Sequence, residues 1–110
     1  MPDPVSRLHE ERQLVLDRLS SLRADYAGIV EAAKASNLDD EHDPEGSTIA
    51  FERSQVGAHI AHAEAHLADI ERALERVRQG SYGICKVCGA RIPEGRLEAR
   101  PTAETCVACA

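Results

Sequence analysis

Four cysteines in the last quarter of the chain have the type and spacing of metal ligands. Cys85 and Cys88 form one Cys-x2-Cys pair, and Cys106 and Cys109 form a second after 17 intervening residues. Each pair makes a tight knuckle that supplies two sulfurs, and the loop between them lets the knuckles close a tetrahedron about 2.3 Å from the metal. Gly89 follows the first knuckle, where glycine adopts backbone conformations that a side chain resists. The pattern predicts one structural Zn²⁺ ion.

Three other uses of these cysteines remain open. Two disulfides would suit a small secreted protein, although the sequence shows no signal peptide. A thioredoxin-like redox pair would need a strand–helix–strand context that is not evident in the sequence. Iron in place of zinc is compatible with the spacing. Because four protein ligands leave no open position for a substrate water, the metal is expected to hold a fold, and the protein is not expected to be an enzyme.

The composition predicts a small protein that needs its metal for stability. The 110 residues include no Trp, one Phe and two Tyr, which is little bulk for a large globular core. No run of 18 apolar residues is present, so no membrane span is expected. The net charge of −6 becomes more negative when four thiolates bind one divalent ion. This balance argues against direct DNA binding and favours a basic protein surface as partner.

Two heptad seams predict an antiparallel helical hairpin. In each seam the positions recur in steps of four and three, which is the repeat of a coiled coil. Each seam contains one arginine, and its other residues are apolar or small. The first helix should start at the N-cap Asp3 and end near Ser36, and a breaker stretch at 37–46 separates it from the second. An intermolecular coiled coil is the competing use of the same heptads. The seam positions are Leu8, Arg12, Val15, Leu19, Leu22, Tyr26, Ile29 and Ala33, then Ile49, Arg53, Val56, Ile60, Ala63, Leu67, Ile70, Leu74 and Val77.

Folding the two seams together predicts the register of the hairpin. The residue numbers of two facing positions add up to 82, as for Leu8 with Leu74 and for Val15 with Leu67. The chain should therefore turn about Glu41. A shift by one heptad fits the periodicity equally well, and only the length of the loop argues against it. The paired region covers roughly 26 residues, or about 40 Å at 1.5 Å per residue.

The predicted fold class is therefore mainly α, with a long antiparallel coiled-coil hairpin and a small four-cysteine zinc finger. The hairpin is assigned to residues 1–80, with its tip at about 37–47, and the finger to residues 81–110. Glycines at 80 and 83 should end the second helix and lead the chain into the finger. The expected apolar cluster of the finger consists of Ile84, Val87, Ile92 and Leu97.

The predicted turn between the helices is strongly acidic. Five acids stand among the seven positions 39–45. The simpler interpretation is a solvated loop in which Asp43 caps the second helix ahead of Pro44. The functional interpretation is that carboxylates of this turn are presented on the end of a long hairpin to a deep, positively charged site or to a metal ion.

Two other polar groups have simple structural interpretations. Three histidines lie at helical spacing beside the second seam, and a solvated flank explains them without a metal. Three arginines of the finger could bind phosphate, but pairing with neighbouring glutamates is the simpler account. The histidines are His59, His62 and His66, the arginines Arg91, Arg96 and Arg100, and the glutamates Glu94, Glu98 and Glu104.

The finger resembles that of the DksA/TraR family. Its most distinctive run is Arg96-Leu-Glu-Ala-Arg100-Pro101, which lies between the two cysteine pairs. The preceding hairpin is similar to that family's coiled coil. The resemblance implies a cytoplasmic, non-enzymatic transcription regulator that binds RNA polymerase, inserts the coiled coil through the secondary channel and places the acidic tip near the active centre. It is expected to act as a monomer.

The resemblance also assigns roles to single residues. The tip signature of the family, Asp-x-x-Asp-x-Ala, is similar to Asp40-x-x-Asp43-x-Glu45, where a glutamate replaces the small residue. The zinc ligands implied are Cys85, Cys88, Cys106 and Cys109.

One further role concerns a nucleotide effector. Arg100 matches a basic residue that, in well-known members of the family, contributes to guanosine tetraphosphate binding at the polymerase interface. Ala110 stands where those members carry a lysine, and their C-terminal helix has no counterpart in the sequence. Polymerase binding is therefore expected more firmly than dependence on that nucleotide. A zinc-stabilised coiled-coil adaptor with another protein partner is the alternative function.

Overall fold

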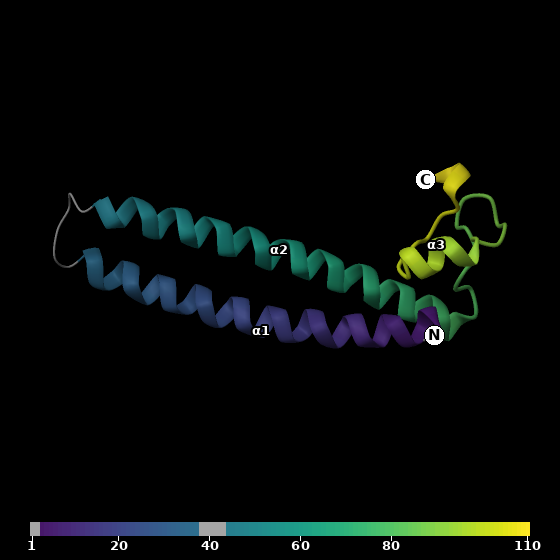
Figure 1. Ribbon diagram of the computed structural model, residues 1–110, viewed down its shortest axis with the longest axis horizontal. Coiled ribbons are helices and arrows are strands. Elements are labelled where there is room, and N and C mark those ends of the chain that lie inside the picture. Colours follow the sequence, from purple (N-terminus) through teal and green to yellow (C-terminus); the bar gives the residue numbers. More distant parts are fainter. Residues whose placement is uncertain (1–2, 38–43) are drawn as a thin grey trace. The chain divides into compact units, whose positions relative to one another are not determined.

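The computed structural model describes residues 3–37 and 44–110. It contains two long helices, α1 (Pro4–Asn37) and α2 (Pro44–Gln79), which run antiparallel (Figure 1). A short helix, α3 (Glu94–Ala99), and a 3-10 turn, η1 (Val107–Cys109), follow in the finger. Within the described ranges, β structure is limited to an isolated antiparallel bridge between Ile84 and Arg91. The mainly helical class is confirmed.

The chain divides into two compact units, each containing part of both long helices. The unit that we call the finger unit comprises Met1–Val15 and His66–Ala110, and the one that we call the hairpin unit comprises Leu16–Ala65. The assignment of 1–80 to a hairpin domain and 81–110 to a finger domain stays a prediction.

The predicted helix ends agree with the observed ones. Asp3 caps α1, because its Oδ1 accepts a hydrogen bond of 2.7 Å from the backbone N–H of Ser6. At the end of α2, Gly80 has a φ of 78°, and the N–H of Ser81 donates to the carbonyl of Arg76 at 2.9 Å. This arrangement is a Schellman motif, which satisfies carbonyls that the helix end leaves free.

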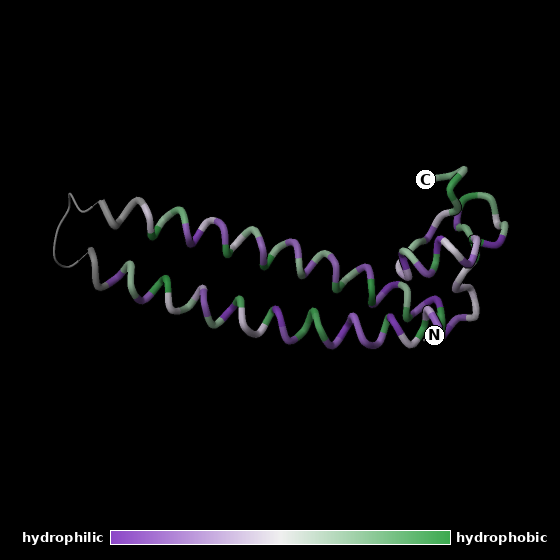
Figure 2. The backbone as a smooth tube through the Cα atoms, in the orientation of Figure 1, coloured by the Kyte–Doolittle hydropathy of each residue, from purple (hydrophilic) through white to green (hydrophobic). Residues whose placement is uncertain are grey.

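Seam residues form the helical core of the finger unit. Figure 2 shows apolar residues recurring along both long helices. Arg12, the polar residue of the first seam, forms a hydrogen-bonded ion pair of 2.6 Å with Glu71, which lies next to its predicted partner Ile70. This contact agrees with the predicted register. The buried positions are the seam residues Leu8, Val15, Ile70 and Leu74, together with Ala73, which is not a seam position.

The hairpin unit follows the same register. Leu19 and Ala63, which were predicted to face each other, are both buried. The ring of Tyr26 lies beside Gly57, where an added Cβ would be 3.8 Å from its Cε2 atom. A shift of the register by one heptad would move Tyr26 and Gly57 apart by about two turns of helix, or roughly 11 Å.

Several predictions concern residues outside the described part of the chain. Asp40 and Asp43 lie there, and so does the side chain of Glu45, whose backbone belongs to α2. Their proposed role at the tip therefore stays a prediction. In the part of the chain that is described, no helix combines the length and apolar character needed to cross a bilayer.

Candidate metal centre

The four cysteines meet at one point of the finger unit. Their Sγ atoms all lie within 4.8 Å of one another. The Sγ atoms of Cys88 and Cys106 are 3.7 Å apart, close to the edge of about 3.8 Å in a tetrahedron whose sulfurs lie about 2.3 Å from zinc. Four soft sulfur donors at these distances fit a tetrahedral zinc ion and leave no position for a reacting water. The converging residues are Cys85, Cys88, Cys106 and Cys109.

The first knuckle is shaped by its backbone. The N–H of Gly89 donates to the carbonyl of Cys85 at 2.9 Å, and the N–H of Cys85 donates to the carbonyl of Ala90 at 2.8 Å. Gly89 has a φ of 75°, which confirms the backbone role predicted for it. These bonds fold the chain back on itself, so that both sulfurs of the pair face the same side.

The second knuckle is a single 3-10 turn. The N–H of Cys109 donates to the carbonyl of Cys106 at 3.1 Å, within η1. Cys106 is extended, with a φ of −76° and a ψ of 170°, and therefore brings the chain straight into the turn.

The thiols differ in the state that their surroundings favour. Backbone N–H groups of Cys88 and Cys106 lower the pKa of Cys85 to about 6, because hydrogen bonds to a thiolate favour the charged form. Hydrogen bonds with the thiol of Cys106, and then with those of Cys88 and Cys85, raise the pKa of Cys109 to about 12. The protein chain alone thus favours the thiolate of Cys85 and the thiol of Cys109, and a divalent cation would have to displace the proton of Cys109.

A small apolar cluster supports the metal centre. It consists of Cys85, Ile92, Leu97 and Ala103, against which the ring of Tyr82 packs. The hydroxyl of Tyr82 donates to the carbonyl of Pro101 at 2.8 Å. One ligand therefore belongs to the core of the finger as well as to the metal site, which couples metal binding to the folding of the finger.

The prediction that Ile84 and Val87 belong to this cluster is wrong. Ile84 is 41% exposed and Val87 is 66% exposed. Val87 lies in the turn between the two cysteines of the first knuckle, where the sulfurs converge on the metal site and the valine side chain stays exposed. Cys85 and Ala103 occupy the core positions instead.

Glu104 anchors the loop before the second knuckle. Its carboxylate accepts from Lys86 Nζ at 2.8 Å, from Arg76 Nη1 at 2.9 Å and from Arg72 Nε at 3.3 Å. The hydrogen bond from Lys86, followed by the hydrogen bond from Arg72 and the positive charge of Arg76, lowers the pKa of Glu104 to about 2. Arg72 and Arg76 belong to α2, so the loop that carries the last two ligands is tied to the end of that helix.

The segment that contains these features matches a known family. Residues 80–110 fit the model described as the prokaryotic dksA/traR C4-type zinc finger. This segment is a DksA/TraR zinc finger. The match, together with the clustered sulfurs, confirms the prediction of one structural zinc ion.

Curated proteins are similar to part of the chain. The chain is 46% identical over 66 residues to the uncharacterized protein YteA of Bacillus subtilis, a match that covers 60% of this chain and 28% of that protein. It is 48% identical over 40 residues to the RNA polymerase-binding transcription factor DksA of Escherichia coli, covering 36% of this chain and 26% of that protein. The chain thus spans between a quarter and a third of the length of these curated relatives.

A solved structure is similar over most of the chain. The structure of transcription factor DksA2 from Pseudomonas aeruginosa has a TM-score of 0.59 and 25% sequence identity, and the match covers 94% of this chain and 80% of that one. The likeness therefore includes the long helices as well as the DksA/TraR finger. The relatives with a named role are transcription factors, in agreement with the expectation that the protein is not an enzyme.

The predicted partners of the arginines in the DksA/TraR finger need correction. Glu104 pairs with Arg72, Arg76 and Lys86, none of which was predicted. Arg96 instead donates to the carbonyl of Thr105 at 2.9 Å. Two of the actual partners of Glu104 come from α2, and no local pattern in the sequence marks them.

The three histidines do not build a second metal centre. His59 and His62 are exposed. The Nε2 atom of His66 lies 3.8 Å from a carboxylate oxygen of Glu11 on α1. Among the described residues, groups of three or more candidate ligands are limited to the four cysteines of the finger.

Proposed function

We propose that this protein is a transcription regulator that binds RNA polymerase. The observation that carries the proposal is the combination of a DksA/TraR finger with two long antiparallel helices, in a chain that resembles a DksA2 structure over 94% of its length. A relative named as an RNA polymerase-binding transcription factor is 48% identical to this chain over 40 residues. A polymerase partner also places the protein in the cytoplasm.

In this proposal zinc has a purely structural part. Bound by Cys85, Cys88, Cys106 and Cys109, the ion supplies the cross-link that holds the two knuckles together. The protein itself supplies the apolar support and the anchoring of the second knuckle to α2. The finger would thereby give the hairpin a defined base from which to engage a partner.

The proposed route of action is the secondary channel of the polymerase. Asp40, Asp43 and Glu45 would form the acidic tip near the active centre, where carboxylates can affect the metal-dependent chemistry or the stability of the open complex. The net charge of −6 supports a protein partner and disfavours direct DNA contact.

Arg100 is proposed as a contact with polymerase or with guanosine tetraphosphate. It is exposed and lines a polar pocket of about 250 Å³, together with the basic residues Arg72, Lys86 and Arg96. Asp69 and Glu104 line the same pocket, and both form ion pairs with its basic residues. This mixed lining favours a protein contact over a strong site for a highly charged nucleotide.

The test is binding of the labelled, zinc-loaded protein to purified RNA polymerase core. A transcript-cleavage factor that occupies the secondary channel serves as competitor. Binding that the competitor displaces would support both the partner and the route. Absence of binding at micromolar concentrations would contradict the proposal and favour a coiled-coil adaptor with another partner.

A second measurement concerns the tip. The double variant Asp40→Asn, Asp43→Asn should still bind the polymerase, but its effect on transcription in vitro should be lost. A control with the same loss of charge is Glu10→Gln, Glu98→Gln, since both glutamates are exposed and far from the tip in sequence. Unchanged regulation by the tip variant would remove these aspartates from the proposal.

A further inference from the structure

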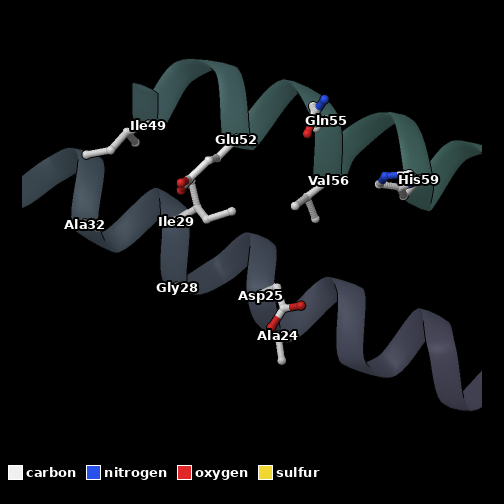
Figure 3. A pocket seen from close by; sticks show the side chains of 10 residues that line it. All are labelled: Ala24, Asp25, Gly28, Ile29, Ala32, Ile49, Glu52, Gln55, Val56 and His59. Atoms are coloured by element: carbon white, nitrogen blue, oxygen red, sulfur yellow. The ribbon is translucent and has the colours of Figure 1, made fainter. Parts of the chain in front are cut away.

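An open groove lies between α1 and α2 in the hairpin unit. It has a volume of about 560 Å³, within the range of ligand-binding clefts (Figure 3). Its apolar floor is formed by Ile29, Ile49 and Val56, all of them at predicted seam positions. These three residues are half-buried, whereas the seam residues Leu19 and Ala63 of the same unit are buried. Along this stretch the helices therefore leave part of their apolar seam uncovered.

The groove exists because one wall is built from small residues. Gly28 and Ala32 stand one turn apart on α1, beside the floor. A Cβ atom added at Gly28 would meet nothing within 4 Å. Larger side chains at these positions would cover the floor from one side, as the flanking residues of a coiled coil normally do.

Gly28 has no structural reason to be glycine. It lies inside α1 and is not among the glycines with positive φ, and glycine in a helix interior costs about 0.5–1 kcal/mol relative to alanine. At Gly57, a glycine inside α2, an added Cβ would instead make an ordinary contact of 3.8 Å with the ring of Tyr26. The helix thus retains a destabilising residue whose evident effect is to keep the groove open.

Both helices place a carboxylate at the groove. Glu52 extends from α2 toward Ile29, and Asp25 stands on α1 (Figure 3). Neither side chain has a hydrogen bond or an ion pair with any residue that the structure describes. Other acids of this unit do have partners, since Glu64 pairs with Arg23 at 3.4 Å and Glu31 with Lys34 at 3.5 Å.

An exposed aromatic side chain lies close to the groove in sequence and on the same helix. Phe51 is the one phenylalanine of the chain, and its side chain is 62% exposed. It precedes Gln55, a residue of the groove wall, by one helical turn. Large exposed apolar side chains next to an apolar groove are typical of interaction surfaces.

We propose that this groove binds a basic amphipathic helix of a partner protein. An apolar side chain of that helix would occupy the floor over Ile29 and Val56, while lysine or arginine side chains would pair with Asp25 and Glu52. The groove extends from position 24 to position 32, about 12 Å at 1.5 Å per residue, and so accepts roughly two turns of helix. The inference goes beyond the proposed function, because it does not require that partner to be RNA polymerase.

The test uses the zinc-loaded full chain, labelled with ¹⁵N, and a synthetic helical peptide. The peptide carries leucine and arginine on one face, about three to four residues apart, and a matched peptide carries glutamate in place of arginine. The arginine peptide should shift the amide resonances of Gly28, Ala32 and Gln55 and leave those of the finger in place. The glutamate peptide should produce no shifts. Equal binding of both peptides, or shifts that map elsewhere, would overturn the proposal.

Variants separate occupation of the groove from general effects on folding. Gly28→Leu should fill the groove and abolish peptide binding, while the thermal midpoint stays the same or rises. Ala27→Leu is the matched control, since Ala27 is exposed on the same helix outside the groove lining, and it should bind normally. Binding by Gly28→Leu at wild-type affinity would refute the proposal.

The charge pairs and the alternative occupant are tested separately. The double variant Asp25→Asn, Glu52→Gln should weaken binding of the arginine peptide by about 2- to 30-fold, as expected for two exposed ion pairs. An unchanged affinity would remove the charge complementarity from the proposal and so overturn it.

A concentration-dependent dimer that Gly28→Leu converts to monomer would show that a second copy fills the groove, which would also overturn it.

Discussion

Arg76 and Glu104, which are 28 positions apart, form a partly buried ion pair of 2.9 Å. Their side chains are 17% and 24% exposed, which makes this the least exposed ion pair in the part of the chain that the structure describes. Arg76 also donates through Nη2 to the carbonyl of Ala103 at 3.1 Å. Its guanidinium therefore binds the end of α2 to two consecutive residues of the loop that leads to the second knuckle.

The first prediction tests this anchor through Glu104. The variant Glu104→Gln keeps the shape of the side chain but loses its charge, leaving Arg76 partly buried without a carboxylate. Breaking a charged hydrogen bond of this kind costs about 1–3 kcal/mol. The free energy of unfolding of the zinc-loaded protein, measured with denaturant, should fall by that amount.

The matched control for this variant is Glu98→Gln. Glu98 lies in α3 of the same finger, and its side chain is exposed. Removal of an exposed charge generally changes stability by no more than about 0.5 kcal/mol. If both variants lose equally little, Glu104 does not anchor the second knuckle.

The second prediction concerns the metal. Cys88→Ser should release zinc and unfold the finger, because a structural zinc site and its fold form together. Zinc content after dialysis and the chemical shift dispersion of finger amides report the two effects. Val87→Ser is the control, since Val87 lies beside the same ligand and is exposed. Retention of one full equivalent of zinc by Cys88→Ser would contradict the assignment of this ligand.

The parts of the structure that were predictable from the sequence depend on local patterns. Helix ends follow from the cap at Asp3 and the glycine at 80, and the cluster of sulfurs follows from the spacing within each Cys-x2-Cys pair. The register of the hairpin follows from heptad positions and a short turn, and the contact of Tyr26 with Gly57 agrees with it. In each case the signal lies within a few residues of the feature or repeats along a helix.

The features that were not predicted depend on packing between distant segments. Glu104 meets Arg72 and Arg76 because the finger folds back against α2, and three nearer arginines were equally plausible partners in the sequence. Val87 is apolar but exposed, because the knuckle turns the cysteine sulfurs, and not the valine, toward the metal site. The groove at Gly28 depends on which flank of the seam stays uncovered, and the heptad pattern alone does not show this.

The third prediction uses the pH dependence of the cap of α1. The hydrogen bond from the backbone of Ser6 is the main cause that lowers the pKa of Asp3 below its usual value. A lowered pKa means that the ionised cap adds stability at pH values above about 4 and that this contribution is lost as the pH falls through the lowered pKa. The stability advantage of wild type over Asp3→Ala should therefore be constant near neutral pH and shrink in acid.

The control for this measurement is Asp3→Asn. Asparagine caps a helix about as well as aspartate but does not titrate, so its advantage over Asp3→Ala should persist in acid. Comparing the thermal midpoints of all three proteins at each pH cancels the effect of zinc loss, which they share. An advantage of wild type that persists equally in acid would show that the charge of Asp3 does not contribute.

The last prediction contrasts two glycines. Gly28→Ala should raise the free energy of unfolding by about 0.5–1 kcal/mol, because the helix interior disfavours glycine and the added Cβ meets nothing within 4 Å. Gly83→Ala should lower it by about 1–2 kcal/mol, because Gly83 has a φ of 82°, a left-handed conformation that strains any residue with a Cβ. Denaturant unfolding of the zinc-loaded variants measures both. Destabilisation by Gly28→Ala would mean that glycine has a structural role in α1, and this would weaken the case that it keeps the groove open.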